Sequence, residues 1–396
     1  MNPRFVFYTN EFVGSLGHLR RTLAIAGRLA AMDRRATSMI LTGSAIEPFF
    51  ALPPRVDTVK LPARRREVNG THRSARLRVE LDELERLRSD ISLAATTSFD
   101  PDVVLVDQVP LGLGTELEAM LEAMKSRGAR LVLGLRDIED SPKHVARKWD
   151  PGMRAVIEHY YDAIIVYGPV SCPNALRCMG WDDIAVPVVY TGYVGAAMPD
   201  CGPSDLEPGY LLATAGGGDD GFAVLESVAE AVRLEPLPCP TVMVTGPLMP
   251  DDDVERLHEL AEGADITIFR SRTDMHHLTV GARGVVSMAG YNTVAEVMQA
   301  RKPALLVPRV RPTEEQLVRA LEVSRRGLQD MLHPDELSPR RTRKALGRLL
   351  ARPLASMYEA GAFTGTELAV GVLHGLVGAA PQNWITNPDA LAEGVA

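Results

Sequence analysis

The run from residue 283 to residue 310 constrains the fold more than any other part of this sequence. Residues 284–288 form a short, valine-rich apolar segment, which is typical of a buried parallel strand. Gly290 then interrupts that segment, because glycine tolerates a tight turn. Apolar residues at helical spacing follow as far as Pro303, and residues 304–307 have the pattern of a second strand. The run therefore predicts a β-α-β unit, which is the building block of an α/β fold.

The turn of this unit is a candidate anion site. The helix of such a unit begins at the carboxyl edge of the sheet, where its unpaired N–H groups and the positive end of its dipole favour an anion. We therefore predict a phosphate seat at Gly290, Tyr291, Asn292 and Thr293. Glu296 follows in the first turn or so, and its carboxylate can accept hydrogen bonds from two neighbouring hydroxyls, such as those of a ribose. Phosphate and ribose within one turn indicate a nucleotide.

Two ordinary uses would explain the same residues. Thr293 would then be the N-terminal cap of the helix, and Glu296 would offset the helix dipole. The spacing alone leaves both interpretations open.

The run resembles the donor-nucleotide signature of the MurG-like glycosyltransferases of the GT-B superfamily. That signature is approximately S-x-x-G-x-x-T-x-x-E, then a proline, an apolar strand that ends in proline, and a segment with glutamine. The matching residues are Ser287, Gly290, Thr293, Glu296, Pro303, Pro308 and Gln316. The resemblance implies that the threonine region faces phosphate, the glutamate holds the ribose hydroxyls and the glutamine lies near the sugar. Where the family often has histidine before the glutamine, this chain has Glu315.

A second candidate site lies between the first expected strand, residues 4–8, and the first helix. Loops at this place line the ligand edge of a doubly wound sheet. Residues 14–20 resemble the G-x-G-H-x-x-R loop of MurG-like transferases and related nucleotide-sugar hydrolases, with Gly17, His18 and Arg20 aligned and a longer spacing between the glycines. Gly17 is thus a candidate donor-binding residue. His18 is the candidate general base, since its unperturbed pKa lies near neutrality; the alternative is a histidine that caps the helix.

Polar residues end two later strands of the first half. Asp107 follows the expected strand 103–106, and Asp137 follows the strand 131–135. Ligand sites of α/β proteins gather at the carboxyl ends of strands, so we predict Asp137 as a second catalytic residue, with Asp107 as a further candidate. Asx turns would explain both aspartates equally well. Arg21, in the first helix, either reaches an anionic group or is solvated.

The basic segment 61–78 has the pattern of a surface loop, because charge runs are usually solvated. In the alternative interpretation its three successive arginines, Arg64, Arg65 and Arg66, meet an anionic acceptor or membrane headgroups. Peripheral contact with a membrane is therefore kept as an expectation.

The second half begins after a linker-like segment rich in proline and glycine. We place an acceptor-binding domain at 1–194, the linker at 195–209, a nucleotide-sugar-binding domain at 210–376 and a tail at 377–396. The last helix is a candidate to cross back to the first domain.

Three consecutive glycines follow the first strand of the second domain. Gly216, Gly217 and Gly218 would let backbone amides close around an anion, although a flexible turn has the same composition. The family resemblance implies that this loop faces the donor diphosphate. It also implies that the loop 269–275 contacts the base, with Arg272 and Met275 as candidate residues.

Composition argues against several other classes of protein. The net charge of -8 disfavours a general nucleic-acid binder. The four cysteines form no CxxC pair and indicate reduced thiols, and no metal or cofactor is expected. No apolar run reaches the length that spans a bilayer and no signal sequence is evident, so we expect a soluble, cytoplasmic protein.

The predicted fold is α/β of the GT-B type, with two doubly wound Rossmann-like domains that face a central cleft. The activity implied by the resemblance is metal-independent, inverting transfer of a sugar from a nucleotide diphosphate sugar, with a UDP-sugar as expected donor. The acceptor would be a hydroxyl or amine of a small or lipid-linked molecule, its identity open, and natural-product biosynthesis is the expected setting. A nucleotide-sugar hydrolase, a sugar epimerase and a non-catalytic nucleotide-sugar-binding protein are the alternatives.

Overall fold

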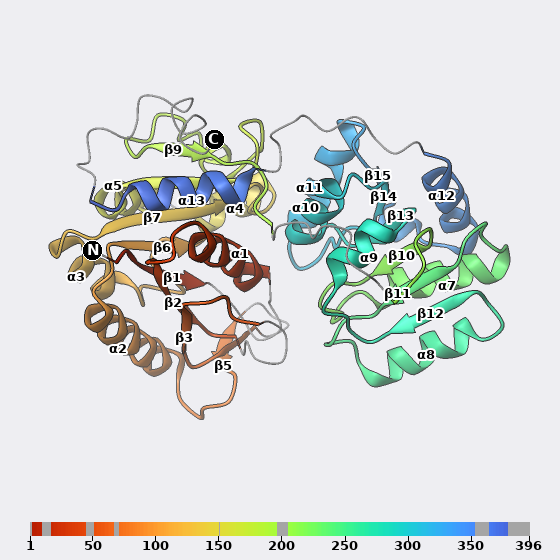
Figure 1. The fold of residues 1–396 in the computed structure, drawn as a ribbon, viewed down its shortest axis with the longest axis horizontal. Helices are drawn as coiled ribbons and strands as arrows, with labels where there is room; N and C mark the ends of the chain where they lie inside the picture. The colour runs from red at the N-terminus through yellow and green to blue at the C-terminus, as the bar shows by residue number, and fades with distance from the viewer. Residues whose placement is uncertain are drawn as a thin grey trace. The chain divides into compact units, whose positions relative to one another are not determined.

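The computed structural model describes residues 2–9, 17–44, 51–66, 71–149, 151–195, 205–352 and 364–378. The chain divides into two compact units, each built around its own parallel sheet (Figure 1). Unit 1 comprises Met1–Ala196 and Gly361–Ala396, and unit 2 comprises Ala197–Ala360. The division falls inside the predicted linker.

Unit 1 is organised around a seven-stranded sheet, as counted over the described residues. Its order is β3-β2-β1-β6-β7-β8-β9, and every pairing is parallel. The strands are β1 (Arg4–Thr9), β2 (Thr37–Thr42), β3 (Val56–Lys60), β6 (Val103–Asp107), β7 (Arg130–Arg136), β8 (Ala163–Tyr167) and β9 (Val188–Tyr190). The central strands β6 and β8 are buried along their whole length, as expected for parallel strands covered by helices on both faces. The strand order reverses between β1 and β6.

Seven helices and a small antiparallel hairpin complete the described part of unit 1. The helices are α1 (Gly17–Met32), α2 (Leu81–Phe99), α3 (Glu118–Ser126), α4 (Pro142–Lys148), α5 (Pro151–Tyr160), α6 (Ala175–Cys178) and α13 (Gly365–Gly375), and the hairpin is β4 (Arg64–Arg66) with β5 (His72–Ser74). Among these residues no helix, and none in unit 2, combines the length and the apolar character needed to cross a bilayer.

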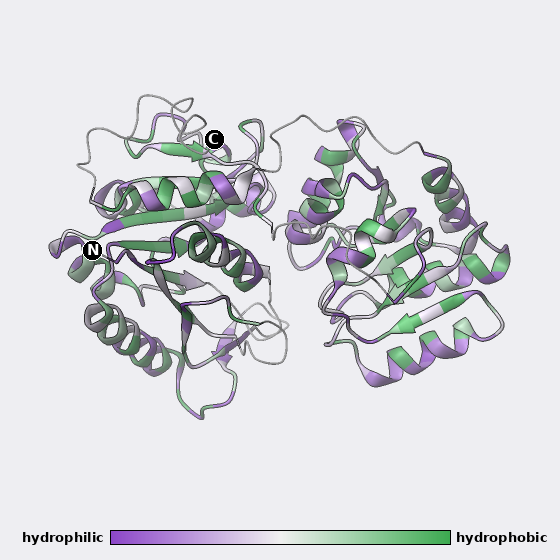
Figure 2. Cartoon of the chain, viewed as in Figure 1, coloured by the Kyte–Doolittle hydropathy of each residue, from purple (hydrophilic) through white to green (hydrophobic). Residues whose placement is uncertain are grey.

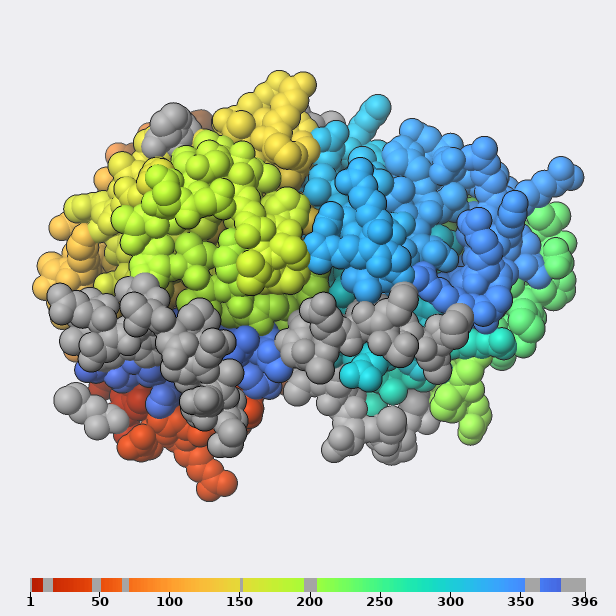
Figure 3. All heavy atoms as spheres, turned by 90° about the horizontal axis from the view of Figure 1, so that it is seen from above, coloured from red at the N-terminus to blue at the C-terminus, as the bar shows by residue number. Residues whose placement is uncertain are grey.

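The C-terminal helix α13 belongs to unit 1, where it packs beside α1 (Figures 1 and 3). His374 Nε2 lies 3.2 Å from Asp33 Oδ2, and Arg28 Nε lies 3.4 Å from Glu367 Oε1. Gly365 touches the main chain of Tyr193 so closely that a Cβ would lie 2.3 Å from its carbonyl oxygen. The sequence-based boundary at 376 is therefore wrong for this helix, which crosses back because its buried apolar residues fit the first unit. Residues 379–396 of the predicted tail lie outside the described part.

Unit 2 contains a six-stranded parallel sheet in the described residues, in the order β12-β11-β10-β13-β14-β15. The strands are β10 (Leu211–Thr214), β11 (Thr241–Val244), β12 (Ile266–Phe269), β13 (Gly284–Ser287), β14 (Ala304–Leu306) and β15 (Asp330–Met331). The helices are α7 (Phe222–Leu234), α8 (Asp251–Ala261), α9 (Met275–Gly281), α10 (Tyr291–Gln299), α11 (Glu315–Arg325) and α12 (Pro339–Ala351), with a 3-10 turn η1 (Pro334–Glu336). The order reverses between β10 and β13. Figure 2 shows apolar strands inside and polar sides on outer helices such as α8.

Candidate functional site

His18 and Asp107 form a hydrogen-bonded pair in unit 1. His18 lies in the first turn of α1, directly after β1, and Asp107 is the last residue of β6, the strand beside β1. His18 Nδ1 lies 2.5 Å from Asp107 Oδ2. The strand order reverses between β1 and β6, and ligands of doubly wound sheets bind at the carboxyl ends of the strands at such a reversal. The sheet therefore builds the pair at its switch point, the usual ligand position of the fold.

Arg21 completes this cluster. Its Nη2 lies 2.7 and 2.8 Å from the two carboxylate oxygens of Asp107, and its guanidinium lies 4.7 Å from the ring centroid of Tyr167. Gly134 leaves room for that ring, since a Cβ there would lie 2.1 Å from the Tyr167 hydroxyl. Arg21 is buried, so the interpretation of this residue as a solvated arginine is wrong. It is thus held between a carboxylate and a ring.

The Asp107 carboxylate is ionised at neutral pH. Burial raises its pKa, but the positive charge of Arg21, then His18, and the hydrogen bonds from both side chains outweigh burial and lower the pKa to about 2. A carboxylate only accepts hydrogen bonds, so the short contact assigns the imidazole proton to His18 Nδ1 and leaves the lone pair on Nε2. The side chain of His18 is 11% exposed. The imidazole can therefore accept a proton at Nε2 while Asp107 stabilises the resulting cation.

Asp137, the predicted second catalytic residue, is not the partner of His18. Its Oδ1 accepts a hydrogen bond from Ile138 N at 2.8 Å, and the residue is buried against Gly168. Asp137 follows β7, which is separated from β1 by β6, so it starts about one strand spacing of ~4.8 Å further from α1 than Asp107. The sequence placed both aspartates at strand ends, but the order of the strands selects Asp107.

In unit 2, the glycine-rich loop after β10 packs against the loop after β11. Gly218 has a φ of +98°, and a Cβ there would lie 2.5 Å from Thr245 O. Gly246, with a φ of +92°, meets Gly217 just as closely, at 2.6 Å. Gly216 also has a positive φ, +65°, but none of the described residues lies within 4 Å of a Cβ built there. Two glycines of this region therefore serve packing, and Gly216 faces open space.

The α10 start has the features of an anion seat. Gly290 is its N-cap, with φ -64° and ψ 146°, and as a glycine it has no side chain that could cap the helix. This excludes the interpretation of Thr293 as the N-terminal cap. Among the described residues, nothing lies within 4 Å of a Cβ built on Gly290, so there is open space on the Cβ side of this residue. The seat is therefore shaped by the main chain, as phosphate sites at helix N-termini are.

The predicted neighbours of this seat follow it in order. Tyr291 is buried, Asn292 and Thr293 are partly buried, and Glu296 lies one turn along the helix with 6% exposure. Ser287 ends β13, and its buried Oγ has no hydrogen-bond partner among the described residues. Thr214 and Ser287 are paired in register. The glycine loop and the α10 turn therefore leave two adjacent strands at the same level, at the switch point of this sheet.

A buried arginine that the sequence gave no reason to single out supports the α10 turn. Arg319 Nη1 donates to Ala289 O at 3.0 Å and contacts Glu315 Oε1 at 2.6 Å, and its guanidinium lies 5.7 Å from the ring centroid of Tyr291. Glu315, where the family often has histidine, is thus part of an internal ion pair. The i, i+4 spacing of Glu315 and Arg319 on α11 is the feature of the sequence from which this ion pair could have been predicted.

Gln316 and Arg272 both have partners that bear on their predicted roles. Gln316 is buried, and its Oε1 accepts from Arg309 N at 3.0 Å, while its NH2 group has no partner within the described part of the chain. That amide can therefore donate to a ligand. Arg272 forms ion pairs with Asp205 at 2.6 Å and Asp274 at 2.7 Å, so it anchors the loop after β12. Met275 is the partly buried first residue of α9.

Arg64 does not lie on a basic surface, contrary to the alternative kept for segment 61–78. It is buried, and it contacts Glu116 Oε2 at 2.9 Å beside Arg88, whose Nε lies 2.6 Å from the same carboxylate. Burial raises the pKa of Glu116, but the two arginines and the hydrogen bond with Tyr8 outweigh burial and lower the pKa below its ordinary value. Arg65 is exposed, and the side chain of Arg66 lies outside the described residues. The alternative interpretation of an anion-binding arginine run therefore does not hold for Arg64.

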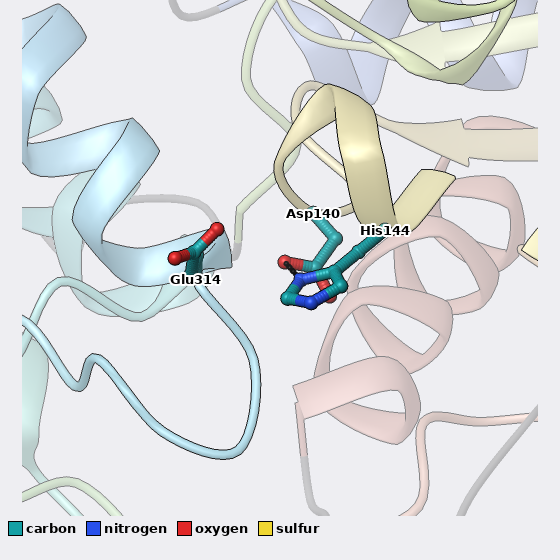
Figure 4. A group of neighbouring side chains, drawn as sticks. All are labelled: Asp140, His144 and Glu314. Atoms are coloured by element: carbon teal, nitrogen blue, oxygen red, sulfur yellow. Dashed lines mark hydrogen bonds and ion pairs between the residues drawn. The ribbon is translucent and has the colours of Figure 1, made fainter. Parts of the chain in front are cut away.

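Asp140 and His144 lie together at the start of α4, with 3.3 Å between Asp140 Oδ1 and His144 Nδ1 (Figure 4). Glu314, which Figure 4 also draws, belongs to unit 2. Within unit 1 the pair supplies two ligands, which is fewer than a metal ion takes from a protein site of its own. We assign no metal site to it.

With this geometry, comparison with known proteins places the chain. Residues 217–369 match the glycosyltransferase family 28 C-terminal domain. No curated protein sequence matches the chain. MurG from Acinetobacter baumannii superposes with a TM-score of 0.59 at 15% identity, over 94% of this chain and 99% of that one. CalG4, the calicheamicin glycosyltransferase, gives 0.59 at 16% over 96% and 99%. A UDP-N-acetylglucosamine 2-epimerase gives 0.61 at 14% over 98% and 99%.

The chain has the GT-B fold with two Rossmann-like domains, so the predicted fold class is confirmed. Within that fold, residues 217–369 match the glycosyltransferase family 28 C-terminal domain, and MurG is among the structures that share the fold at low sequence identity, in agreement with the resemblance. The domain match supports glycosyl transfer as the class of activity.

Proposed function

We propose that the protein is an inverting glycosyltransferase that moves a sugar from a nucleotide diphosphate sugar, with UDP as the leaving group, to a hydroxyl or amine acceptor. The observation that carries this proposal is the pair of switch-point sites. Unit 1 holds an imidazole poised as a base by Asp107, and unit 2 holds an uncapped helix start one turn from the buried Glu296. A base and a nucleotide seat are the two parts that sugar transfer requires.

In the proposed reaction, Nε2 of His18 takes the proton of the acceptor as its oxygen or nitrogen attacks the anomeric carbon. The new glycosidic bond forms as the bond from that carbon to the diphosphate breaks, and the electron pair leaves with the nucleoside diphosphate. A single displacement inverts the anomeric configuration. Asp107 holds the imidazolium that forms, as the carboxylate of a catalytic triad does.

Unit 2 would bind the donor without a metal ion. The N–H groups at the start of α10 and the loop at Gly216 supply donors for the diphosphate, and Glu296 would accept hydrogen bonds from the ribose hydroxyls. The Gln316 amide is a further group that could donate a hydrogen bond to the donor. The acceptor is proposed only by class, as a small or lipid-linked molecule with a free hydroxyl or amine.

A thermal-shift panel of nucleotides and nucleotide sugars tests the proposal, because a ligand that binds the folded state raises the melting temperature. UDP and UDP-sugars should raise it, and EDTA should not change that shift. UDP release that depends on an added acceptor, with an inverted anomeric product by NMR, should follow. An enzyme that binds no nucleotide in the panel would contradict the proposal.

An epimerase is the second candidate, because the epimerase superposes at least as well as the transferases do. Incubation with UDP-N-acetylglucosamine and no acceptor separates the possibilities. A change of configuration at C2 with the UDP still attached indicates the epimerase, and rapid stoichiometric release of free sugar indicates a hydrolase.

A further inference from the structure

One ion pair of unit 2 joins two loops that leave different strands. Arg309 Nη1 lies 3.0 Å from Asp220 Oδ2. Asp220 belongs to the loop after β10 and Arg309 to the segment after β14, and these strands lie on opposite sides of β13 (Figure 1). The pair therefore bridges the width of the strand whose carboxyl end leads into α10.

The register fixes this placement. Thr214, Ser287 and Leu306 are paired in one row across β10, β13 and β14. The glycine loop, the α10 turn and the Arg309 segment thus start from the same level of the sheet. The α10 turn lies between the two loops that the ion pair joins. A diphosphate seated on the α10 amides would lie within reach of the same guanidinium.

Arg309 is anchored by its main chain and held loosely by its side chain. Its N–H donates to the buried Gln316 at 3.0 Å, while its side chain is 31% exposed and that of Asp220 is 34% exposed. Two other arginines of unit 2, one on α11 and one in the loop after β12, are held more firmly by their partners. Arg319 is fully buried on Glu315, and Arg272 has two carboxylates. Of these three, Arg309 is the one whose charge a ligand can take over.

We propose that Arg309 binds the diphosphate of the nucleotide sugar, and that Asp220 is a place-holder that the diphosphate displaces. This inference rests on the proposed function and adds to it the residue that neutralises the leaving group. A guanidinium offers two parallel N–H groups that match phosphate oxygens, and a diphosphate carries more negative charge than one carboxylate. An ion pair this exposed is weak, so exchanging its anion costs little.

Calorimetric titration of the full chain with uridine, UDP and inorganic pyrophosphate tests this assignment. In Arg309→Gln we expect UDP and pyrophosphate to bind on the order of tenfold more weakly and uridine to bind as before, because only the charged ligands lose a charge-assisted hydrogen bond. Arg309→Lys should recover part of the loss. Asp220→Asn should tighten UDP about two- to threefold, since it removes the competing anion.

Arg343→Gln is the matched control. Arg343 forms a similar ion pair, 2.7 Å from Glu235, but at the carboxyl end of α7 and thus at the opposite edge of the sheet. It should leave all three ligands unaffected, and melting temperatures verify the fold of each variant.

Three outcomes would overturn the assignment. Unchanged UDP affinity in Arg309→Gln would show that this residue does not bind the diphosphate. Equal losses for uridine and UDP would show that its role is structural. Weaker UDP binding in Asp220→Asn would show that Asp220 supports the site. These results leave the proposed function intact, whereas a wild-type protein that binds neither UDP nor pyrophosphate would overturn both.

Discussion

The candidate sites at the two switch points are built from different parts of the protein. In unit 1, functional atoms come from side chains that hold one another: His18, Asp107 and Arg21 form one buried cluster. In unit 2, the first contacts offered to a ligand come from the main chain, through Gly216 and the uncapped turn at Gly290. A proton transfer needs one atom with a tuned pKa, while a diphosphate needs many weak donors, and each region supplies what its chemistry requires.

The largest effect should follow from removing the base. His18→Ala is expected to lower kcat by about 10²–10⁴-fold, the range of general base catalysis, with UDP affinity nearly unchanged because unit 2 holds the donor. Steady-state kinetics with acceptor and a separate UDP titration measure the two quantities.

His374→Ala is the control for this variant, since His374 also pairs with an aspartate, Asp33, but beyond the carboxyl end of α1. It should leave kcat unchanged. A His18 variant that loses UDP affinity and kcat in parallel would break the contrast between a side-chain site and a main-chain site.

Acid should weaken unit 1 through Asp107. Its pKa is about 2 in the folded protein against an ordinary value of 3.8, so its interactions stabilise the fold above that ordinary value and are lost as the pH falls towards 2. The shift corresponds to roughly 2 kcal/mol of unfolding free energy.

Denaturant unfolding at pH 6, pH 4 and pH 2.5 measures this contribution to the free energy of unfolding. Asp107→Asn, which cannot titrate, should lose about 1.5 kcal/mol less than wild type over that range, because pH 2.5 still lies above the folded pKa. Equal losses would mean that Arg21 and His18 do not hold the carboxylate in solution. Burial raises the pKa of Glu139, but Lys148, Arg136 and Gln108 lower it to about 2. Protonation of Glu139 therefore lowers the free energy of unfolding equally in both proteins.

Sequence patterns predicted the β-α-β units and the loops that follow their strands, because these depend on local spacing. They failed where strand order decides. Asp107 and Asp137 look alike in the sequence, and only the neighbour of β1 meets His18. Burial of Arg64 and Arg319 was equally out of reach, since the partner carboxylate of Arg64 lies far along the chain and charge patterns do not show which arginines are buried.

Glu296, the predicted ribose contact, is the side chain of unit 2 on which the binding of uridine itself should depend. Glu296→Ala is expected to weaken UDP and uridine alike by about tenfold, because both ligands carry the two hydroxyls. 2′-Deoxyuridine diphosphate should lose affinity for the wild type and show little further loss in the variant. Uridine affinity that survives the substitution would remove the ribose assignment.

The smallest and most specific effect is expected from one methyl group at the α10 turn. Gly290 has a φ of -64°, which any residue adopts, and open space where a Cβ would stand. Gly290→Ala should therefore keep the wild-type melting temperature. If the diphosphate sits on the α10 amides, the methyl group meets it, and UDP should bind about three- to fivefold more weakly while uridine is unaffected. Gly347→Ala, which adds the same group to α12, is the control for unit 2. Equal UDP affinity in both variants would move the diphosphate away from α10 and leave the glycine loop after β10 as the main-chain seat.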